Sequence, residues 1–556
     1  MSAPRDSPPR DLSDSRAPVL ITGARVSGRP QDPAREAMLL NGERIVAVGE
    51  PEELRELAGP GACELDVGGR RVVAGLIDSH AHVLRAGLTW QREVHWSGVA
   101  SLEQALALVS DRAARLPAGE WIPVIGGWHP AQFSQGRTPT REELDRAAPE
   151  NPCYVQILYD EAVLNSAALA ACGFAADNAD PPGGSVERGG DGVPTGIVRG
   201  FGAFRHCLEK MGRPGREEQA LSIRSMLREL AGLGLTGALD PGGIGVVPDT
   251  YQPLYDVWRA GHLSLRLRLF LGAGERGDER RQLEDWMRFM PRGFGDAMLR
   301  ITGIGEIIVF RCWDGDGLTP FAIDADSFRE FTEISALAAA GGWPMHVHAI
   351  RDETAGAILD SWEDVDRRHP IAGLRFCLAH AEGISDRNLK RARALGLGLA
   401  LQDRMLMRAS GSAPGWGEEA VERAPPLRRM IELGFPIGGG TDATVVSSIN
   451  PWTSLWWMVS GRTFGGPRRV AEHRLTREQA LGFYTHGSAW FSSEEHLRGR
   501  LTGGQLADIA VLSDDYYGVE EDAIPALRSD LTLVGGRIVH ASAHFSGVEA
   551  EVNPPG

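Results

Sequence analysis

The sequence lacks three features, and each absence excludes a class of protein. Its six cysteines are scattered over 556 residues without a C-x-x-C pair, which is typical of reduced thiols and not of a disulfide framework. No apolar run approaches the roughly eighteen residues that a membrane span requires, and the first residues contain no hydrophobic signal core. We therefore expect a cytoplasmic protein that has no membrane partner.

Basic residues are also in the minority. The chain has 58 lysines and arginines against 74 aspartates and glutamates, for a formal net charge of −16. A surface that binds nucleic acid or an anionic membrane needs a positive field. We therefore expect neither partner. We also expect a small-molecule substrate and a homo-oligomer, namely a dimer.

The length suits a large barrel with a smaller satellite domain. Residues 1–16 are rich in proline, serine, aspartate and arginine and are predicted to form a disordered tail. Short strand-like runs separated by Gly and Asn-Gly turns follow over 17–71, with a hairpin signal at Asn41-Gly42, and similar runs return over 491–545. We predict that these two segments form one composite, β-sandwich-like domain.

Residues 72–490 alternate strand-like runs with helical patterns, which predicts the α/β class. With the opening run at Val72, eight strands are expected, the tally of a (β/α)8 TIM-like barrel. The other seven runs cover 235–240, 265–271, 301–310, 343–350, 374–381, 397–402 and 435–443. Residues 83–233 break this rhythm, and we predict that they form a long insertion that partly acts as a lid over the barrel mouth.

The first barrel strand ends in an H-x-H pair. His80 and His82 are two residues apart, so on an extended strand both imidazoles point to the same face and offer two nitrogen ligands to a metal such as zinc. Taken alone, such a pair also occurs by chance on polar loops.

Other predicted strands end in further ligand-type residues, namely Glu306, His348, His380 and Asp442. In this fold the functional groups lie at the carboxyl ends of the strands. Each residue also has an ordinary structural interpretation: a packed histidine, a carboxylate paired with an arginine, or a helix N-cap. Their convergence favours a metal centre, at which Asp442 would accept a proton from the attacking water and pass it to the leaving nitrogen. His346, which faces away from His348, should be dispensable.

Several motifs occur in an order that resembles the amidohydrolase superfamily. They are VVAGLIDSHAH, PTGIV at 194–198, HAI at 348, HAEGIS at 380, GGTDA at 439 and LADIAVL near the end. The branch that the chain resembles is the YtcJ-like amidohydrolase family 3, which includes N-substituted formamide deformylase, and the resemblance runs from Val19 to His540. It implies that His80 and His82 bind the more buried metal, that His348 and His380 bind a second one, and that Asp442 is a ligand and the catalytic acid/base.

The sequence departs from the family at two places. Many relatives bridge two metals with a carboxylated lysine on the fourth strand, but residues 301–310 contain no lysine, and Glu306 stands in what we take to be its place. If Arg311 is instead the counterpart, the site holds one metal. Where a Gly-His pair is expected, the chain has Asp160 and Glu161, which indicates an altered substrate specificity.

We expect a divalent metal, zinc above manganese or iron, as one or two ions. The predicted substrate-binding residues are Trp128, His129, Asp160, Trp313 and Trp452, although tryptophans are equally suited to a core. The predicted activity is metal-dependent hydrolysis of an amide-type C–N bond. The alternatives are a C–C or C–O cleaving or decarboxylating enzyme of the same superfamily, and a non-catalytic scaffold with the same fold.

Overall fold

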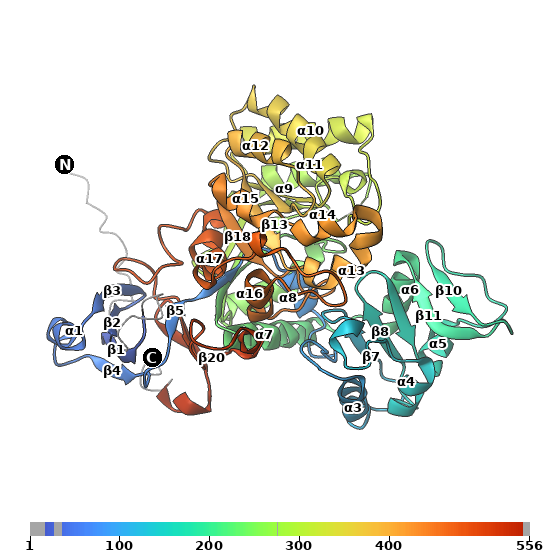
Figure 1. Ribbon diagram of the computed structural model, residues 1–556, viewed down its shortest axis with the longest axis horizontal. Coiled ribbons are helices and arrows are strands. Elements are labelled where there is room, and N and C mark those ends of the chain that lie inside the picture. The colour runs from blue at the N-terminus through green and yellow to red at the C-terminus, as the bar shows by residue number, and fades with distance from the viewer. Residues whose placement is uncertain (1–16, 27–35, 275, 549–556) are drawn as a thin grey trace, which may run out of the picture.

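Three parts make up the computed structural model, which describes residues 17–26, 36–274 and 276–548. A barrel occupies the centre, a domain built from both ends of the chain lies on one side, and a separate sheet lies on the other (Figure 1). The tail predicted over 1–16 falls outside the described residues. None of the described helices is both long and apolar enough to cross a membrane.

The barrel consists of eight parallel strands in the order in which they occur in the chain. Ser79 donates a backbone hydrogen bond of 2.9 Å to the carbonyl oxygen of Gly439, which links the first strand to the eighth. This arrangement confirms the predicted α/β fold with a (β/α)8 barrel. The strands are β6 (Leu76–Asp78), β12 (Leu235–Asp240), β13 (Arg266–Leu271), β14 (Leu299–Glu306), β15 (Met345–Ala349), β16 (Cys377–His380), β17 (Gly398–Gln402) and β18 (Ile437–Gly440).

Helices surround these strands, and each buries the face that its apolar residues define. In α10 the Asp324 side chain accepts hydrogen bonds from the first turn, and Phe331, Ile334 and Ala338 are buried at helical spacing. The helices are α2 (Val83–Gly87), α7 (Arg216–Gly232), α8 (Gln252–Arg259), α9 (Glu279–Phe289), α10 (Ala325–Ala340), α11 (Asp352–Asp366), α12 (Asp386–Ala394), α13 (Met405–Trp416), α14 (Glu418–Arg423), α15 (Leu427–Glu432), α16 (Pro451–Ser460) and α17 (Arg477–Gly482).

The two ends of the chain meet in a β-sandwich. One sheet contains β1 (Val19–Ala24), β2 (Glu36–Asn41), β3 (Arg44–Gly49) and β4 (Cys63–Asp66), and the other contains β5 (Val72–Ala74), β19 (Ile509–Leu512), β20 (Ser529–Val534) and β21 (Arg537–Ala541). Residues from both sheets share one apolar core, and α1 (Pro51–Ala58) packs beside the first sheet. The predicted boundary at Val72 is wrong, because Val72–Ala74 pairs with β19 and the barrel begins at Leu76.

The insertion after the first barrel strand carries its own five-stranded sheet. Its elements are α3 (Leu102–Ala113), β7 (Ile122–Ile125), α4 (Arg141–Ala147), β8 (Cys153–Ile157), β9 (Glu161–Leu164), α5 (Ser166–Cys172), β10 (Ser185–Arg188), β11 (Pro194–Arg199) and α6 (Phe201–Met211). The predicted limits of 83–233 are too wide, because α2 and α7 pack on each other and α7 packs on α8 as part of the barrel's helical layer.

Candidate metal centre

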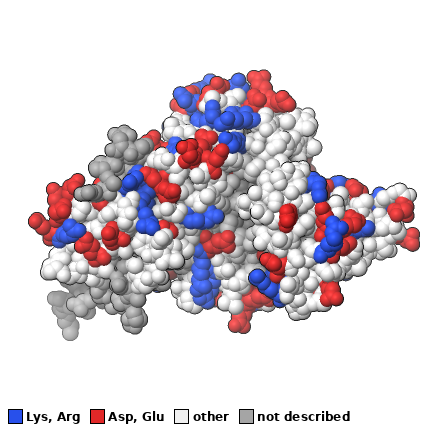
Figure 2. Space-filling model, turned by 60° about the horizontal axis from the view of Figure 1, so that its bottom comes forward, with Lys and Arg blue, Asp and Glu red and all other residues white. Residues whose placement is uncertain are grey.

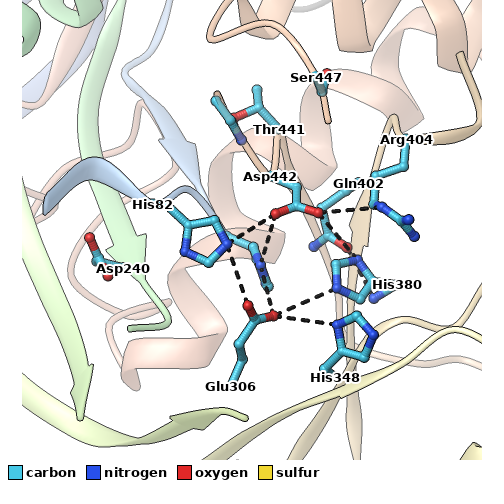
Figure 3. A network of polar contacts seen from close by, with 12 residues as sticks. His82, Asp240, Glu306, His348, His380, Gln402, Arg404, Thr441, Asp442 and Ser447 are labelled. Carbon is cyan, nitrogen blue, oxygen red and sulfur yellow. Dashed lines mark hydrogen bonds and ion pairs between the residues drawn. The ribbon is translucent and has the colours of Figure 1, made fainter. Parts of the chain in front are cut away.

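Six side chains with metal-ligating atoms meet at the carboxyl ends of the barrel strands, and five of them are labelled in Figure 3. Every one of them is buried, with at most 7% of the residue exposed. They are the six predicted metal ligands: His80, His82, Glu306, His348, His380 and Asp442. Residues more than 350 positions apart in the sequence thus form one cluster, because parallel strands of a barrel end at one rim.

Backbone geometry directs these side chains inward. The strand β6 ends at Asp78, so His80 and His82 lie just beyond it and not within the strand, and His82 is the residue that precedes α2. His380 and Asp442 have φ angles of 70° and 57°. This left-handed conformation is uncommon for residues other than glycine and is concentrated at functional sites.

Asp78 connects the first strand to the eighth beneath the cluster. Its carboxylate accepts hydrogen bonds from the backbone N–H of His80 and from both the N–H and the hydroxyl of Thr441. In addition, Asp442 donates its N–H to the carbonyl oxygen of His80 at 2.8 Å. The two ligand-bearing segments are therefore held in register.

The Glu306 carboxylate lies at the centre of the cluster. Its Oε1 is 3.4 Å from Nε2 of His82, and its Oε2 is 3.4 Å from Nε2 of His80. The same Oε2 is 3.7 Å from both Nδ1 of His348 and Nε2 of His380. Oε1 therefore faces His82, and Oε2 faces the other three histidines.

These separations match the spacing of ligands around one small cation. Two ligand atoms about 2.1 Å from a tetrahedral ion lie ~3.4 Å apart. His80, His82, Glu306 and Asp442 are separated by 3.1–3.5 Å across four nitrogen–oxygen pairs. Nε2 of His80 and Oε2 of Glu306 have no hydrogen-bond partner although they are buried. The residues present therefore fit a divalent metal.

The charges at the centre also favour a cation. Burial alone would raise the pKa of Glu306, but the facing histidines, His80 above all, outweigh burial and hold that pKa well below its ordinary value. Asp442 has its pKa lowered in the same way by His80 and His82. Both carboxylates are therefore ionised at neutral pH.

A second layer of contacts orients the histidine rings. Nδ1 of His82 lies 2.8 Å from the carbonyl oxygen of Gly242, and Nε2 of His348 lies 2.8 Å from Oδ1 of Asp314. Nδ1 of His80 lies 2.8 Å from Nε2 of His346. Such partners fix the orientation and tautomer of a ligating imidazole. The expectation that His346 is dispensable is therefore revised, because its side chain contacts a predicted ligand.

Two residues that sequence reasoning missed lie at the end of β17 and just beyond it. Gln402 accepts a hydrogen bond from the backbone N–H of His380 at 3.0 Å. Arg404 is buried, and its Nε lies 3.5 Å from Oδ2 of Asp442 (Figure 3). The available signal was the polar run Gln402–Arg404 directly after the apolar strand residues.

A cavity of about 30 Å³ opens beside the cluster. Its walls include five of the six predicted ligands, together with Arg85, Tyr159 and Trp313. A larger hollow of about 500 Å³ lies among α9, α10 and α11, in the outer helical layer, where Arg280, Glu333 and Arg368 form part of its lining. The metal-ligating side chains face only the smaller cavity of these two.

Of the five residues predicted to bind substrate, only Trp313 lines the cavity. Trp128 and Trp452 are fully buried core residues whose indole N–H groups donate to the carbonyl oxygens of Gln156 and Leu233. His129 stacks against Phe464, and Asp160 pairs with Arg408 at 2.7 Å. We therefore remove these four from the pocket wall. Tryptophan in this chain is used mainly for packing.

Comparison with known proteins identifies the family. A model of the amidohydrolase family matches residues 64–540. The chain belongs to this family. It is 27% identical to N-substituted formamide deformylase from Arthrobacter pascens, in an alignment that covers 95% of this chain and 98% of that protein. It is 25% identical to the putative amidohydrolase YtcJ from Bacillus subtilis (strain 168), with coverage of 91% and 96%.

Solved structures agree with this amidohydrolase assignment at the level of the fold. An uncharacterized metal-dependent hydrolase from Pyrococcus furiosus superposes with a TM-score of 0.64 and 22% identity, covering 90% of this chain and 100% of that one. A mutant of atrazine chlorohydrolase from Arthrobacter aurescens TC1, complexed with zinc and atraton, superposes with a TM-score of 0.52 and 17% identity, covering 94% and 95%. The chain is thus an amidohydrolase-family member with the barrel of metal-dependent hydrolases.

Proposed function

We propose that this amidohydrolase is a metal-dependent enzyme that hydrolyses an amide-type C–N bond of a small organic molecule. The observation that carries the proposal is the buried set of four histidines and two carboxylates, spaced as ligands of a cation at the barrel mouth. The resemblance to a formamide deformylase over 95% of the chain supports the C–N bond as the one that is cleaved.

We further propose two ions, most simply zinc, with Glu306 between them. His80, His82 and Asp442 would hold one ion, and His348 and His380 would hold the other. The contacts of the Glu306 carboxylate with histidines of both sets support a bridging role. Lys210 and Lys390, the two lysines of the chain, lie in the helices α6 and α12, so a carboxylated lysine does not compete for this position.

A bound divalent cation at such a site acidifies water and polarises a substrate carbonyl. Asp442 would receive the proton of the attacking water and deliver it to the leaving nitrogen, which departs as an amine. Arg404 holds Oδ2 of Asp442 from the side away from His82 and helps to keep the carboxylate ionised. The hydrogen bond from the His380 N–H to Gln402 joins strands β16 and β17 next to this pair.

A small-molecule substrate is also proposed because the cavity has a volume of only about 30 Å³. On the face shown in Figure 2, basic and acidic side chains are interspersed and form no continuous positive surface. This distribution supports a substrate that enters the cavity over a polymer that binds along the surface.

Metal analysis and one variant test the proposal. Purified protein should contain close to two equivalents of metal per chain and release amines from a panel of N-substituted formamides and acylated amines. Asp442→Asn should lower turnover by at least 10³-fold while retaining most of the metal, since the amide side chain cannot take up a proton. Full activity in this variant would remove Asp442 from the mechanism.

Glu306→Gln is the matching test of the bridge. A neutral amide is a weaker ligand than a carboxylate, so the expected result is a loss of about one metal equivalent per chain. Unchanged stoichiometry would show that Glu306 does not bridge. Metal below half an equivalent, without rescue by added zinc or manganese, would favour a non-catalytic scaffold instead. Cleavage of C–C or C–O bonds in the absence of amine release would favour another reaction of the same fold.

A further inference from the structure

Arg85 places a guanidinium in the wall of the metal-centre cavity. The helix α2 begins at Val83, directly after His82, so Arg85 is three residues from a predicted metal ligand. Arg85 and His82 both line the cavity, so the first turn of α2 brings this cation close to the metal centre.

The other arginines near the cavity are paired with acidic side chains, whereas Arg85 is not. Arg404 pairs with Glu382 at 3.1 Å, and Arg408 pairs with Asp160. For Arg85, the described part of the chain contains no carboxylate within ion-pair distance and no hydrogen-bond acceptor. The residue is only partly exposed. Asp442 and Glu306 help to raise the pKa of Arg85 against burial from beyond contact distance, but a shielded arginine normally has a direct partner.

Tyr159 contributes a second donor to the same cavity from the insertion. It lies in the turn between β8 and β9 and lines the cavity with Arg85. Burial raises the pKa of Tyr159, and the nearby Arg85 opposes that rise only in part. The phenol therefore keeps its proton at neutral pH, and no acceptor for it is found among the described residues.

The chemistry of these donors selects a carboxylate. A guanidinium offers two parallel N–H groups that match the two oxygens of a carboxylate, and a phenol adds a third hydrogen bond. Glu306 and Asp442 lie across the cavity and would repel an anion while they are uncompensated. Metal ions on those two groups would remove this repulsion, so anion binding should be strongest in the metal-loaded protein.

We propose that Arg85, assisted by Tyr159, binds a carboxylate of the substrate, so that the enzyme acts on carboxylate-bearing amides of the N-acyl amino acid type. The proposal rests on the proposed function, because it assigns a substrate class to the same metal centre. The cavity of about 30 Å³ has room for little more than one water molecule. Entry of such a substrate therefore requires the cavity to widen.

Binding of an inert ligand tests Arg85 without relying on turnover. N-benzenesulfonylglycine and its methyl ester differ only in the masked carboxylate, and a sulfonamide resists amide hydrolysis. Calorimetric titration into metal-loaded protein should give a Kd at least tenfold lower for the acid. Arg85→Gln should abolish that preference, and Arg85→Lys should retain part of it. Tyr159→Phe should weaken binding of the acid several-fold. Arg205→Gln, an exposed arginine of α6, is the matched control.

Two results would overturn the proposal: equal affinity for acid and ester in the unaltered protein, or a preference for the acid that survives in Arg85→Gln. The second would mean that the metals bind the carboxylate. Thermal unfolding verifies that each variant is folded.

Kinetics separates this inference from the proposed function. With N-formyl amino acids and their methyl esters, kcat/KM for amine release should favour the acids at least tenfold, and Arg85→Gln should erase the ratio mainly through KM. If no amide is cleaved, the proposed function fails, and the binding experiment alone then shows whether Arg85 binds a carboxylate. If acids and esters are cleaved equally and bind equally, the metal-dependent activity stands and the role of Arg85 falls.

Discussion

His346 and His348 are two residues apart on the strand β15, so their side chains share one face of it, and both contact the metal centre. His348 points to Glu306, whereas His346 reaches the ring of His80 from the barrel interior. Burial and the neighbouring His80 hold the pKa of His346 well below its ordinary value, so this ring is neutral. A neutral imidazole accepts one hydrogen bond, and it receives the one from His80 when Nε2 of His80 faces a metal.

The first prediction concerns this contact. His346→Ala should leave the buried Nδ1–H of His80 without an acceptor and lower metal affinity about 10- to 100-fold. Competition with a chelator of known affinity measures the change. His346→Gln, which keeps a hydrogen-bond acceptor near that position, should recover part of the lost metal affinity. Equal metal affinity in His346→Ala and the parent protein would mean that the contact has no role in binding.

Glu93 is a shielded carboxylate outside the site whose ionisation opposes folding. Its Oε1 accepts a hydrogen bond from the Thr89 hydroxyl, and burial raises its pKa from 4.5 to about 7. The folded state therefore holds the proton more firmly than the unfolded state. Stability from this group is fully present below about pH 4.5 and is lost as the pH rises to about 7.

The second prediction follows from this loss of stability as the pH rises. Glu93→Gln, which is always neutral, should gain about 1–2 kcal/mol over the parent protein at pH 8, less than the full pKa difference implies because the side chain is partly exposed. Near pH 4.5 the two proteins should be almost equal. Urea unfolding at both pH values measures this, with the exposed Glu103→Gln as a control. A gain that is the same at both pH values would disprove the assignment.

At the scale of elements, the turn between β8 and β9 attaches the insertion to the barrel. Asp160 in this turn places both oxygens 2.7 Å from Nη1 of Arg408 on α13. The preceding residue, Tyr159, lines the cavity. This ion pair therefore joins the insertion to the barrel beside the metal centre. The carboxylate that sequence reasoning assigned to substrate pairs with Arg408 in the structure.

The third prediction is that Asp160→Asn loosens this turn. Asp160 is about half exposed, so the stability loss should stay below about 1 kcal/mol. KM should rise several-fold with kcat within twofold, and hydrogen exchange over residues 157–161 should accelerate. Glu161→Gln is a matched control, because Glu161 pairs with Arg199 inside the insertion. An equal rise in KM in both variants would show that the contact with Arg408 is not what holds the turn.

At the scale of the whole molecule, a buried ion pair joins the sandwich to the barrel. Arg266, the first residue of β13, contacts Asp508 at 2.9 Å, and both side chains are only 2% exposed. Asp508 also accepts the N–H of Gly535 at 2.7 Å. This junction lies at the amino ends of the strands, opposite the metal centre, where interactions of a barrel serve stability.

The fourth prediction is that Asp508→Ala destabilises the protein by about 3–5 kcal/mol, because it leaves a buried arginine uncompensated. Thermal unfolding should show a clear decrease in Tm, while the folded fraction keeps its metal content. Glu64→Ala removes an exposed pair with Arg55, with side chains 44% and 47% exposed, and should cost at most about 1 kcal/mol. Similar losses in both variants would contradict the role assigned to the junction.

The positions of the strands and their order could be predicted from the sequence because they depend on local periodicity. All eight barrel strands occur where apolar runs predicted them, and the ligand-type residues follow those runs. Errors arose where a short segment could serve two sheets. Val72–Ala74 and Leu76–Asp78 are separated only by Gly75, and nothing in their composition assigns the first to the sandwich and the second to the barrel.

The sequence by itself determined the class of fold, the order of the strands and the identity of the six residues at their ends, since each follows from spacing along the chain. Only the tertiary structure decided which groups surround them. It brought His346 to His80, Arg404 to Asp442 and Arg85 to the cavity, and it enclosed Trp128 and Trp452 in cores. These contacts join residues from different strands, and their partners depend on how the barrel closes, which no local pattern encodes.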